Sequence, residues 1–184
     1  MGRISELLEQ YTAEHSNFET KRNYISLSQI HMSPEQLLHT FYNGFEDGHE
    51  IRLRCYKGYQ MERDLKARII AVFGEKINPT VEISLHDGLV QGHPDLEYDG
   101  YPADCKTVPL DEHLPKDGKL SRKIYWQLQG YMHYKKVHQA VAIYESRETG
   151  IIRDIWITSN QSIQKEIQWK VDYVVQRIKQ SIAA

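Results

Sequence analysis

The sequence predicts an α/β fold in which helices alternate with two groups of strands. Apolar residues recur every three or four positions over 50–73, over 121–137 and near the C-terminus, which is the period of a helix packed on one face. Segments of strand length lie between these helices, and Asp-Gly turn signals separate the first of them. The expected order is helices, three strands, a helix, two strands and a last helix.

Two helices are expected before the main body of the fold. Residues 3–14 predict a short helix, and a second helix is expected over 33–42. The second begins with Ser33 as the N-cap, Pro34 at the first helical position and Gln36 at the third, which is a capping pattern.

The helix over 50–73 carries a carboxylate in its apolar stripe. The apolar members of this stripe are Ile51, Cys55, Tyr59, Leu65, Ile69 and Phe73. Glu62 has the same spacing, and a carboxylate that faces a core is costly unless it is paired or bound to a metal. Pairing with Arg63 or Lys66 and metal binding are both open at this point.

Three strands are expected next, over 81–85, 89–97 and 101–108. Asp99-Gly100 is typical of a type I′ hairpin turn, because both residues tolerate positive φ. The strands then form a meander, with Asp95 opposite Asp104 and His93 opposite Lys106.

Strand alternation gives this hairpin an acidic face. His93, Asp95, Asp104 and Lys106 are expected on one face, and Cys105 is expected to pack in the core on the other. Directly opposed side chains have Cβ atoms about 5 Å apart, so two carboxylates repel unless a proton or a cation lies between them. A hard divalent ion would remove this repulsion. The alternative is a surface hairpin whose carboxylates turn into water.

The rest of the chain predicts a helix over 121–137, strands over 139–144 and 151–158, and a C-terminal helix. The apolar stripe of the last helix is interpreted as core packing rather than as a partner site. Its members are Ile163, Ile167, Val171, Val174, Ile178 and Ile182.

Four motifs occur in a fixed order between residues 58 and 131. They are Gly58-x-x-x-Glu62, Gly92-x-Pro94-Asp95, Asp104-x-Lys106 and Gln127-x-x-x-Tyr131. Together they resemble the PD-(D/E)XK nuclease superfamily, and in particular its RecB-like and lambda-type exonuclease branch, which has a QxxxY motif. The resemblance implies a restriction-endonuclease-like αβββαβ core, with a mixed central sheet flanked by helices.

The resemblance also implies a catalytic set of Glu62, Asp95, Asp104 and Lys106. The three acids and the backbone carbonyl of Cys105 would bind Mg²⁺, for which Mn²⁺ could substitute, since Mg²⁺ prefers oxygen ligands. Lys106 would orient the attacking water or stabilise the transition state.

Further residues are candidates for binding the substrate. Gln127 and Tyr131 project from one face of a helix and would contact DNA near the metal. Besides them, the candidate contacts are His93, Lys119, Arg122 and Lys123. For His93 the alternative is a local strand cap, and for the three cations it is a solvated helix start.

Composition limits the classes of protein. The 184 residues are 40% hydrophobic and 26% charged, which excludes wholesale disorder. The net charge of −2 excludes a chain that attracts DNA through its overall charge, so basic residues must gather locally. Two cysteines are too few for a four-cysteine iron–sulfur cluster. No apolar run suits a membrane span or a signal peptide, so a cytoplasmic protein is expected.

We therefore expect a single nuclease domain over 1–184, with an N-terminal helical segment (1–48), a catalytic core (49–160) and a C-terminal helix (161–184). The expected activity is metal-dependent hydrolysis of DNA phosphodiesters by an exonuclease of recombination, repair or phage DNA processing. DNA is the expected partner, and a recombination or helicase protein is a candidate second one. A structure- or site-specific endonuclease and a non-catalytic DNA-binding module are the alternatives.

Overall fold

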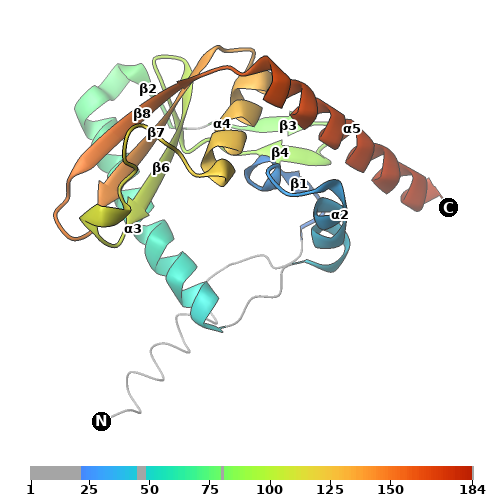
Figure 1. Ribbon diagram of the computed structural model, residues 1–184, viewed down its shortest axis with the longest axis horizontal. Helices are drawn as coiled ribbons and strands as arrows, with labels where there is room; N and C mark the ends of the chain where they lie inside the picture. Colours follow the sequence, from blue (N-terminus) through green and yellow to red (C-terminus); the bar gives the residue numbers. More distant parts are fainter. Residues whose placement is uncertain (1–21, 45–48, 80, 184) are drawn as a thin grey trace, which may run out of the picture.

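The computed structural model describes residues 22–44, 49–79 and 81–183, with side chains from residue 56 onward in the second range. The predicted helix over 3–14 and the side chains of Ile51 and Cys55 lie outside the described residues. The described chain forms a five-stranded sheet, a three-stranded sheet and the helices that cover them (Figure 1). The predicted α/β class, with a mixed sheet flanked by helices, is confirmed.

The larger sheet has the strand order β2-β5-β6-β7-β8. Its strands are β2 (Ile77–Asn78), β5 (Leu96–Tyr98), β6 (Tyr101–Val108), β7 (Gln139–Ser146) and β8 (Ile152–Thr158). The central β6 and β7 are parallel, and the other neighbours are antiparallel. A parallel pair needs a crossover connection, which α4 (Arg122–Lys135) provides.

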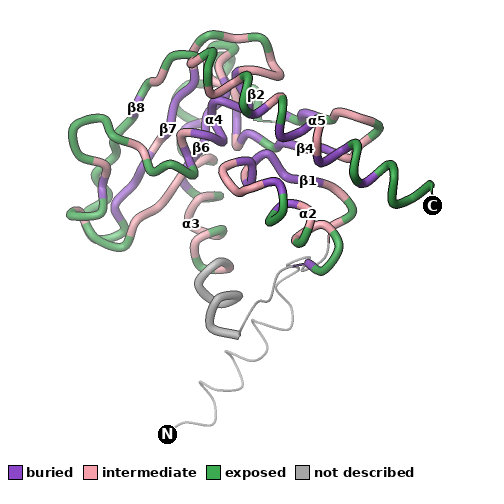
Figure 2. Tube along the Cα trace, turned by 45° about the vertical axis from the view of Figure 1, so that its right-hand side comes forward, coloured by how far each residue is buried: buried purple, intermediate pink, exposed green. Residues whose placement is uncertain are grey.

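Helices cover both faces of this sheet. Leu65 and Ile69 of α3 (His49–Phe73) pack with Cys105 and Val141 in a small core on one face. On the other face, α4 packs on β6 and β7, and α5 (Gln161–Ala183) packs on α4, so that both helices contribute to a larger core. The edge strand β8 is mostly exposed, so buried and exposed positions do not alternate along it (Figure 2).

The smaller sheet has the order β1-β4-β3, with β1 (Ile25–Ser26), β4 (Val90–Gly92) and β3 (Ile83–Leu85). The predicted strand over 89–97 is therefore wrong as a single strand. The chain leaves the small sheet after Gly92 and enters the large sheet at Leu96, and Pro94 lies at the break. Proline has no N–H to donate to a sheet ladder, which explains the interruption.

The predicted hairpin turn and helix start are both confirmed. Asp99 and Gly100 have φ of 51° and 84°, as a type I′ turn requires, and Leu96 pairs with Ala103 in the expected register. Ser33 and Gln36 form a reciprocal capping box at the start of α2 (Pro34–Asn43).

The expected apolar stripes are only partly buried. On α5, Ile167, Val171, Val174 and Ile178 are buried, but Ile182 is 72% exposed because the helix extends past the core. On α3, Tyr59 is 55% exposed, so the prediction that it packs in the core is wrong. Among the described helices, none is long and apolar enough to cross a membrane.

Candidate active site

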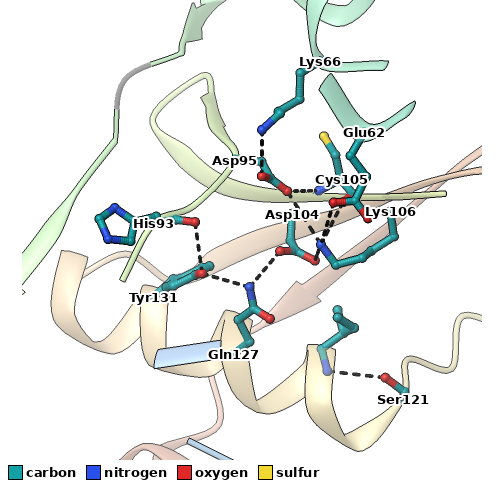
Figure 3. Close-up of polar contacts among 11 residues, drawn as sticks. Glu62, Lys66, His93, Asp95, Asp104, Cys105, Lys106, Ser121, Gln127 and Tyr131 are labelled. Carbon is teal, nitrogen blue, oxygen red and sulfur yellow. Dashed lines mark hydrogen bonds and ion pairs between the residues drawn. The ribbon is translucent and has the colours of Figure 1, made fainter. Parts of the chain in front are cut away.

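Four charged side chains that the sequence predicts to act together meet beside the middle of β6. Asp104 and Lys106 lie two residues apart on this strand, so they share one face of the sheet. Glu62 reaches the same point from α3, and Asp95 reaches it from the segment directly before β5 (Figure 3). Residues from three parts of the sequence therefore form one cluster.

The ammonium of Lys106 lies among three carboxylates. Its Nζ is 3.1 Å from Asp104 Oδ2, 3.7 Å from Glu62 Oε2 and 3.8 Å from Asp95 Oδ2. Lys106 Nζ also donates a hydrogen bond of 2.8 Å to the carbonyl of Cys105. All four oxygens therefore face one small volume.

Asp95 is held by two donors outside this group. Its Oδ1 accepts a hydrogen bond of 3.0 Å from Lys66 Nζ, and its Oδ2 accepts one of 2.7 Å from the backbone N–H of Cys105. The sequence indicates Lys66 only as a partner for Glu62. Its contact with Asp95 joins residues 29 positions apart, and no local spacing indicates it.

Asp104 is held from the opposite side by α4. Gln127 Nε2 donates hydrogen bonds of 2.8 Å both to Asp104 Oδ1 and to the hydroxyl oxygen of Tyr131. The Tyr131 hydroxyl in turn donates to the carbonyl of His93 at 3.2 Å. Gln127 and Tyr131 are 5% and 1% exposed, so their polar groups are engaged inside the protein rather than open to a substrate.

Burial sets the protonation of the cluster. It raises the pKa of Asp104 above the ordinary carboxyl range, and the nearby ammonium of Lys106 opposes this shift. Burial likewise raises the pKa of Glu62 against the attraction of Lys106. Burial alone would lower the pKa of Lys106, but the carboxylates of Asp104, Asp95 and Glu62 raise it above its usual value. As the cluster stands, Lys106 is a cation and a hydrogen-bond donor.

The donor chemistry of the cluster fits a hard divalent cation. It offers carboxylate oxygens and one backbone carbonyl, which are the ligands that Mg²⁺ prefers. Asp104 Oδ2 is buried and has the ammonium of Lys106 as a charge partner, but no hydrogen-bond donor with suitable geometry. Within the described residues, no group of three or more His, Cys, Asp or Glu side chains is spaced to hold a metal as it stands. The ammonium of Lys106 lies where the carboxylates converge, so a metal would require it to move aside.

The thiol of Cys105 takes no part in the cluster. It lies in the smaller core, as strand alternation predicts, and burial raises its pKa. Only the backbone of Cys105 faces the charged side chains, with its N–H on Asp95 and its carbonyl on Lys106.

The predicted position of His93 is wrong. His93 lies outside both strands at the Pro94 break, so it does not pair with Lys106, and its ring is exposed and turned away from the carboxylates (Figure 3). Its carbonyl, rather than its imidazole, contacts the site through Tyr131.

The three cations predicted to contact DNA are exposed, but their side chains have different neighbours. They are Lys119, Arg122 and Lys123. Lys123 lies close enough to Asp104 to oppose the rise in its pKa. Arg122 instead lies over the ring of Trp126, 5.3 Å from its centre. Lys119 lies in the exposed segment before α4, and no contact joins it to the described cluster.

No protein-family model matches the chain, and no curated protein sequence is significantly similar to it. Solved structures do resemble it. The alkaline exonuclease LHK-Exo from Laribacter hongkongensis, in complex with dAMP, is 16% identical, with a TM-score of 0.66 over 95% of this chain and 94% of that one. A phage-related exonuclease from Haemophilus somnus 129PT is 13% identical, with a TM-score of 0.60 over 86% of this chain and 96% of that one. The chain therefore shares the fold of these exonucleases.

Proposed function

We propose that the protein is a metal-dependent deoxyribonuclease that hydrolyses DNA phosphodiester bonds, acting as an exonuclease of the RecB-like and lambda type. The observation that carries this proposal is the convergence of Glu62, Asp95 and Asp104 on Lys106, with oxygens 3.1 to 3.8 Å from its ammonium. The likeness to exonuclease folds, one of them solved with dAMP, supports the same reading. Such an activity would serve DNA recombination, repair or phage DNA processing.

Glu62, Asp95, Asp104 and the carbonyl of Cys105 would hold Mg²⁺, or Mn²⁺ in its place. When bound, such an ion would neutralise charge on the phosphate and make a water molecule more acidic. The chain's own residues supply the positions of these oxygens. Lys66 and the Cys105 N–H hold Asp95, and Gln127 holds Asp104. Gln127 and Tyr131 then act through Asp104.

Lys106 is the residue best placed to contact the reacting groups. Hydrolysis forms a bond between a water oxygen and phosphorus, breaks one ester P–O bond, and leaves a proton on the departing oxygen. Negative charge grows on the phosphoryl oxygens meanwhile, and a fixed ammonium that donates hydrogen bonds stabilises it. In the cluster as it stands the neighbouring carboxylates raise the pKa of Lys106, so we assign it the role of a cation that orients water or phosphate rather than that of a base.

The exposed cations Lys119, Arg122 and Lys123 lie before or at the start of α4 and would track the DNA backbone. Lys123 is the member nearest to Asp104. These three cations would give the protein a local positive potential for DNA, although the net charge of the whole chain is −2.

The proposal is tested with end-labelled linear and circular DNA, single- and double-stranded, in Mg²⁺, Mn²⁺ or EDTA. Lys106→Ala and Asp95→Asn are the site variants, and Lys165→Ala on the exposed surface of α5 is the matched control. We expect metal-dependent loss of linear DNA, which both site variants lose by at least about a hundredfold and the control retains.

Each other outcome has a distinct meaning. Cleavage of circular DNA would identify an endonuclease built on the same site. Cleavage that persists in EDTA, or in Asp95→Asn at the rate of the parent, would contradict the assigned chemistry. DNA binding without cleavage under any condition would favour a non-catalytic binding module.

A further inference from the structure

Lys66 is a second lysine of the charged cluster. It lies on α3 four residues after Glu62, so both side chains leave the same face of the helix. Its Nζ is 3.0 Å from Asp95 Oδ1, and its side chain is 24% exposed. The charge of Lys66 also opposes the rise in the pKa of Glu62 that burial causes. One helix thus supplies both an acid and a cation to the site (Figure 3).

The two aspartates of the cluster are held in the same way from opposite sides. For Asp104, Oδ1 accepts a hydrogen bond from Gln127 on α4, and Oδ2 faces Lys106. For Asp95, Oδ1 accepts a hydrogen bond from Lys66 on α3, and Oδ2 faces Lys106. Each carboxylate therefore has one oxygen bonded to a helix and one turned to the centre.

We propose that Lys66 is a positioning residue, which fixes the Asp95 carboxylate so that Oδ2 stays directed at the reacting groups. The inference rests on the proposed nuclease function. Asp95 comes from the connection between two sheets, and its backbone N–H donates a hydrogen bond of 3.0 Å to the carbonyl of Ala103 on β6. This bond holds the backbone of Asp95 but leaves its side chain free to rotate. A charge-assisted hydrogen bond at Oδ1 and the Cys105 N–H at Oδ2 together restrict the rotation of this side chain.

A contact between Lys66 and a DNA phosphate is the competing role. The ammonium already forms an ion pair and a hydrogen bond with Asp95, and three quarters of the side chain is covered. Lys66 is therefore less available to a phosphate than the exposed Lys123.

The test compares Lys66→Met, Lys66→Arg and the control Lys57→Met, which removes an exposed lysine from the same helix. Cleavage of linear DNA is measured at saturating Mg²⁺. We expect Lys66→Met to lower kcat about 10- to 100-fold with KM for DNA unchanged within about twofold, since small misplacements of reacting groups have effects of this size. Lys66→Arg should recover most of kcat, and Lys57→Met should match the parent. Melting curves confirm that each variant is folded.

A second measurement needs no DNA. Calorimetric titration with Mn²⁺ separates orientation from simple charge, because the two predict opposite signs. Removing a nearby positive charge should tighten the binding of a cation. Loss of the orientation of Asp95 should weaken it, and we expect Lys66→Met to bind Mn²⁺ several-fold more weakly than the parent and Lys66→Arg.

The outcomes distinguish this inference from the proposed function. The positioning role would be overturned if Lys66→Met kept the kcat of the parent or bound Mn²⁺ more tightly. It would also be overturned if only KM for DNA rose, and that result would identify a phosphate contact. If the parent cleaves no DNA, the nuclease proposal fails, and the Mn²⁺ titration still decides whether Lys66 orients Asp95. A parent that binds no Mn²⁺ would overturn both.

Discussion

At the scale of single residues, the burial of Asp104 dominates the electrostatics of the site. Its side chain is 2% exposed, whereas those of Asp95 and Glu62 are 17% and 24% exposed. Gln127 and Lys106 each contact one of its oxygens, yet burial still raises its pKa. The ionised form of Asp104 is therefore less stable in the folded protein than in water, so the site is maintained at a cost to the fold.

This shift predicts a dependence of stability on pH. A group whose pKa is raised by folding stabilises the fold below its unfolded pKa, roughly 4 for a carboxyl group, and loses this contribution as the pH rises through its folded pKa. Asp104→Asn removes the ionisation. We expect its free energy of unfolding to increase relative to that of the parent, meaning that the variant becomes relatively more stable, as pH rises from about 4 to 8, by about 1.4 kcal/mol for each unit of pKa shift.

The measurement is urea denaturation of parent and variant at several pH values without added metal. Asp154→Asn on the exposed face of β8 is the matched control. If the stability of Asp104→Asn relative to the parent declined with rising pH, folding would lower the pKa of Asp104 in the parent instead of raising it.

The sequence predicts some of these residues and not others, for physical reasons. Strand alternation places Asp104 beside Lys106, because a period of two is a local property. The role of Lys66 depends on a contact with a residue 29 positions away, which local spacing does not encode. Strand alternation predicts the wrong position for His93, because the strand does not continue through Pro94, where the chain changes sheets.

At the scale of elements, α4 carries two buried glutamines with different tasks. Gln127 donates to Asp104 and Tyr131. Gln129 donates to the carbonyl of Thr158 and accepts from the N–H of Asn160, thereby joining α4 to the start of α5. Both side chains are almost wholly buried, so each serves as a control for the other.

We predict that Gln127→Leu and Gln129→Leu destabilise the fold to a similar extent but differ in activity. Each leaves a buried acceptor or donor without its partner, which costs about 1–3 kcal/mol. Only Gln127→Leu frees the Asp104 carboxylate, so only this variant should lose most of its DNA cleavage at a temperature where both are folded. Denaturation midpoints and initial rates check this. Equal loss of activity in the two variants would mean that Gln127 acts only through stability.

Two glycines predict opposite effects on stability. A Cβ on Gly92 would lie 2.6 Å from Leu27 Cδ1 and 3.1 Å from Tyr131 Cε1, both in the buried core, so Gly92→Ala should destabilise the fold by about 1–3 kcal/mol. A Cβ on Gly58 meets nothing within 4 Å, and the residue lies inside α3. Gly58→Ala should therefore stabilise the fold by about 0.5–1 kcal/mol.

Thermal and urea denaturation of both variants test this pair of predictions, and DNA cleavage by Gly58→Ala should equal that of the parent. A destabilised Gly58→Ala would show that the glycine serves a packing or functional purpose in α3. A stable Gly92→Ala would show that Leu27 can move aside without cost.

The elements that were predicted correctly have long or distinctive patterns. The helices α3, α4 and α5 have many turns, and the Asp99-Gly100 turn has a strict requirement for positive φ. The strands β1 and β2 have two residues each, too few for any period to be visible, and their pairing with β4 and β5 depends on tertiary packing.

At the scale of the whole molecule, the site lies where the two cores and the two sheets meet. Its acids come from α3, from the connection between the sheets and from β6, and α4 closes it from the other side. The sequence predicts this element order, but not that the three expected neighbouring strands divide between two sheets. The division arises from one proline and from pairing between distant segments, so it could not be deduced from local pattern.

The parallel pairing of β6 with β7 has a consequence for how the protein is made. Such a pair forms only after its crossover helix has packed, since the connection must close before the strands can meet. Asp104 lies on β6, and its partner Gln127 lies on the crossover helix itself. During synthesis, we therefore expect the acidic centre to be assembled only after β7 has left the ribosome, so a shorter nascent chain carries Asp104 and Gln127 without their final arrangement.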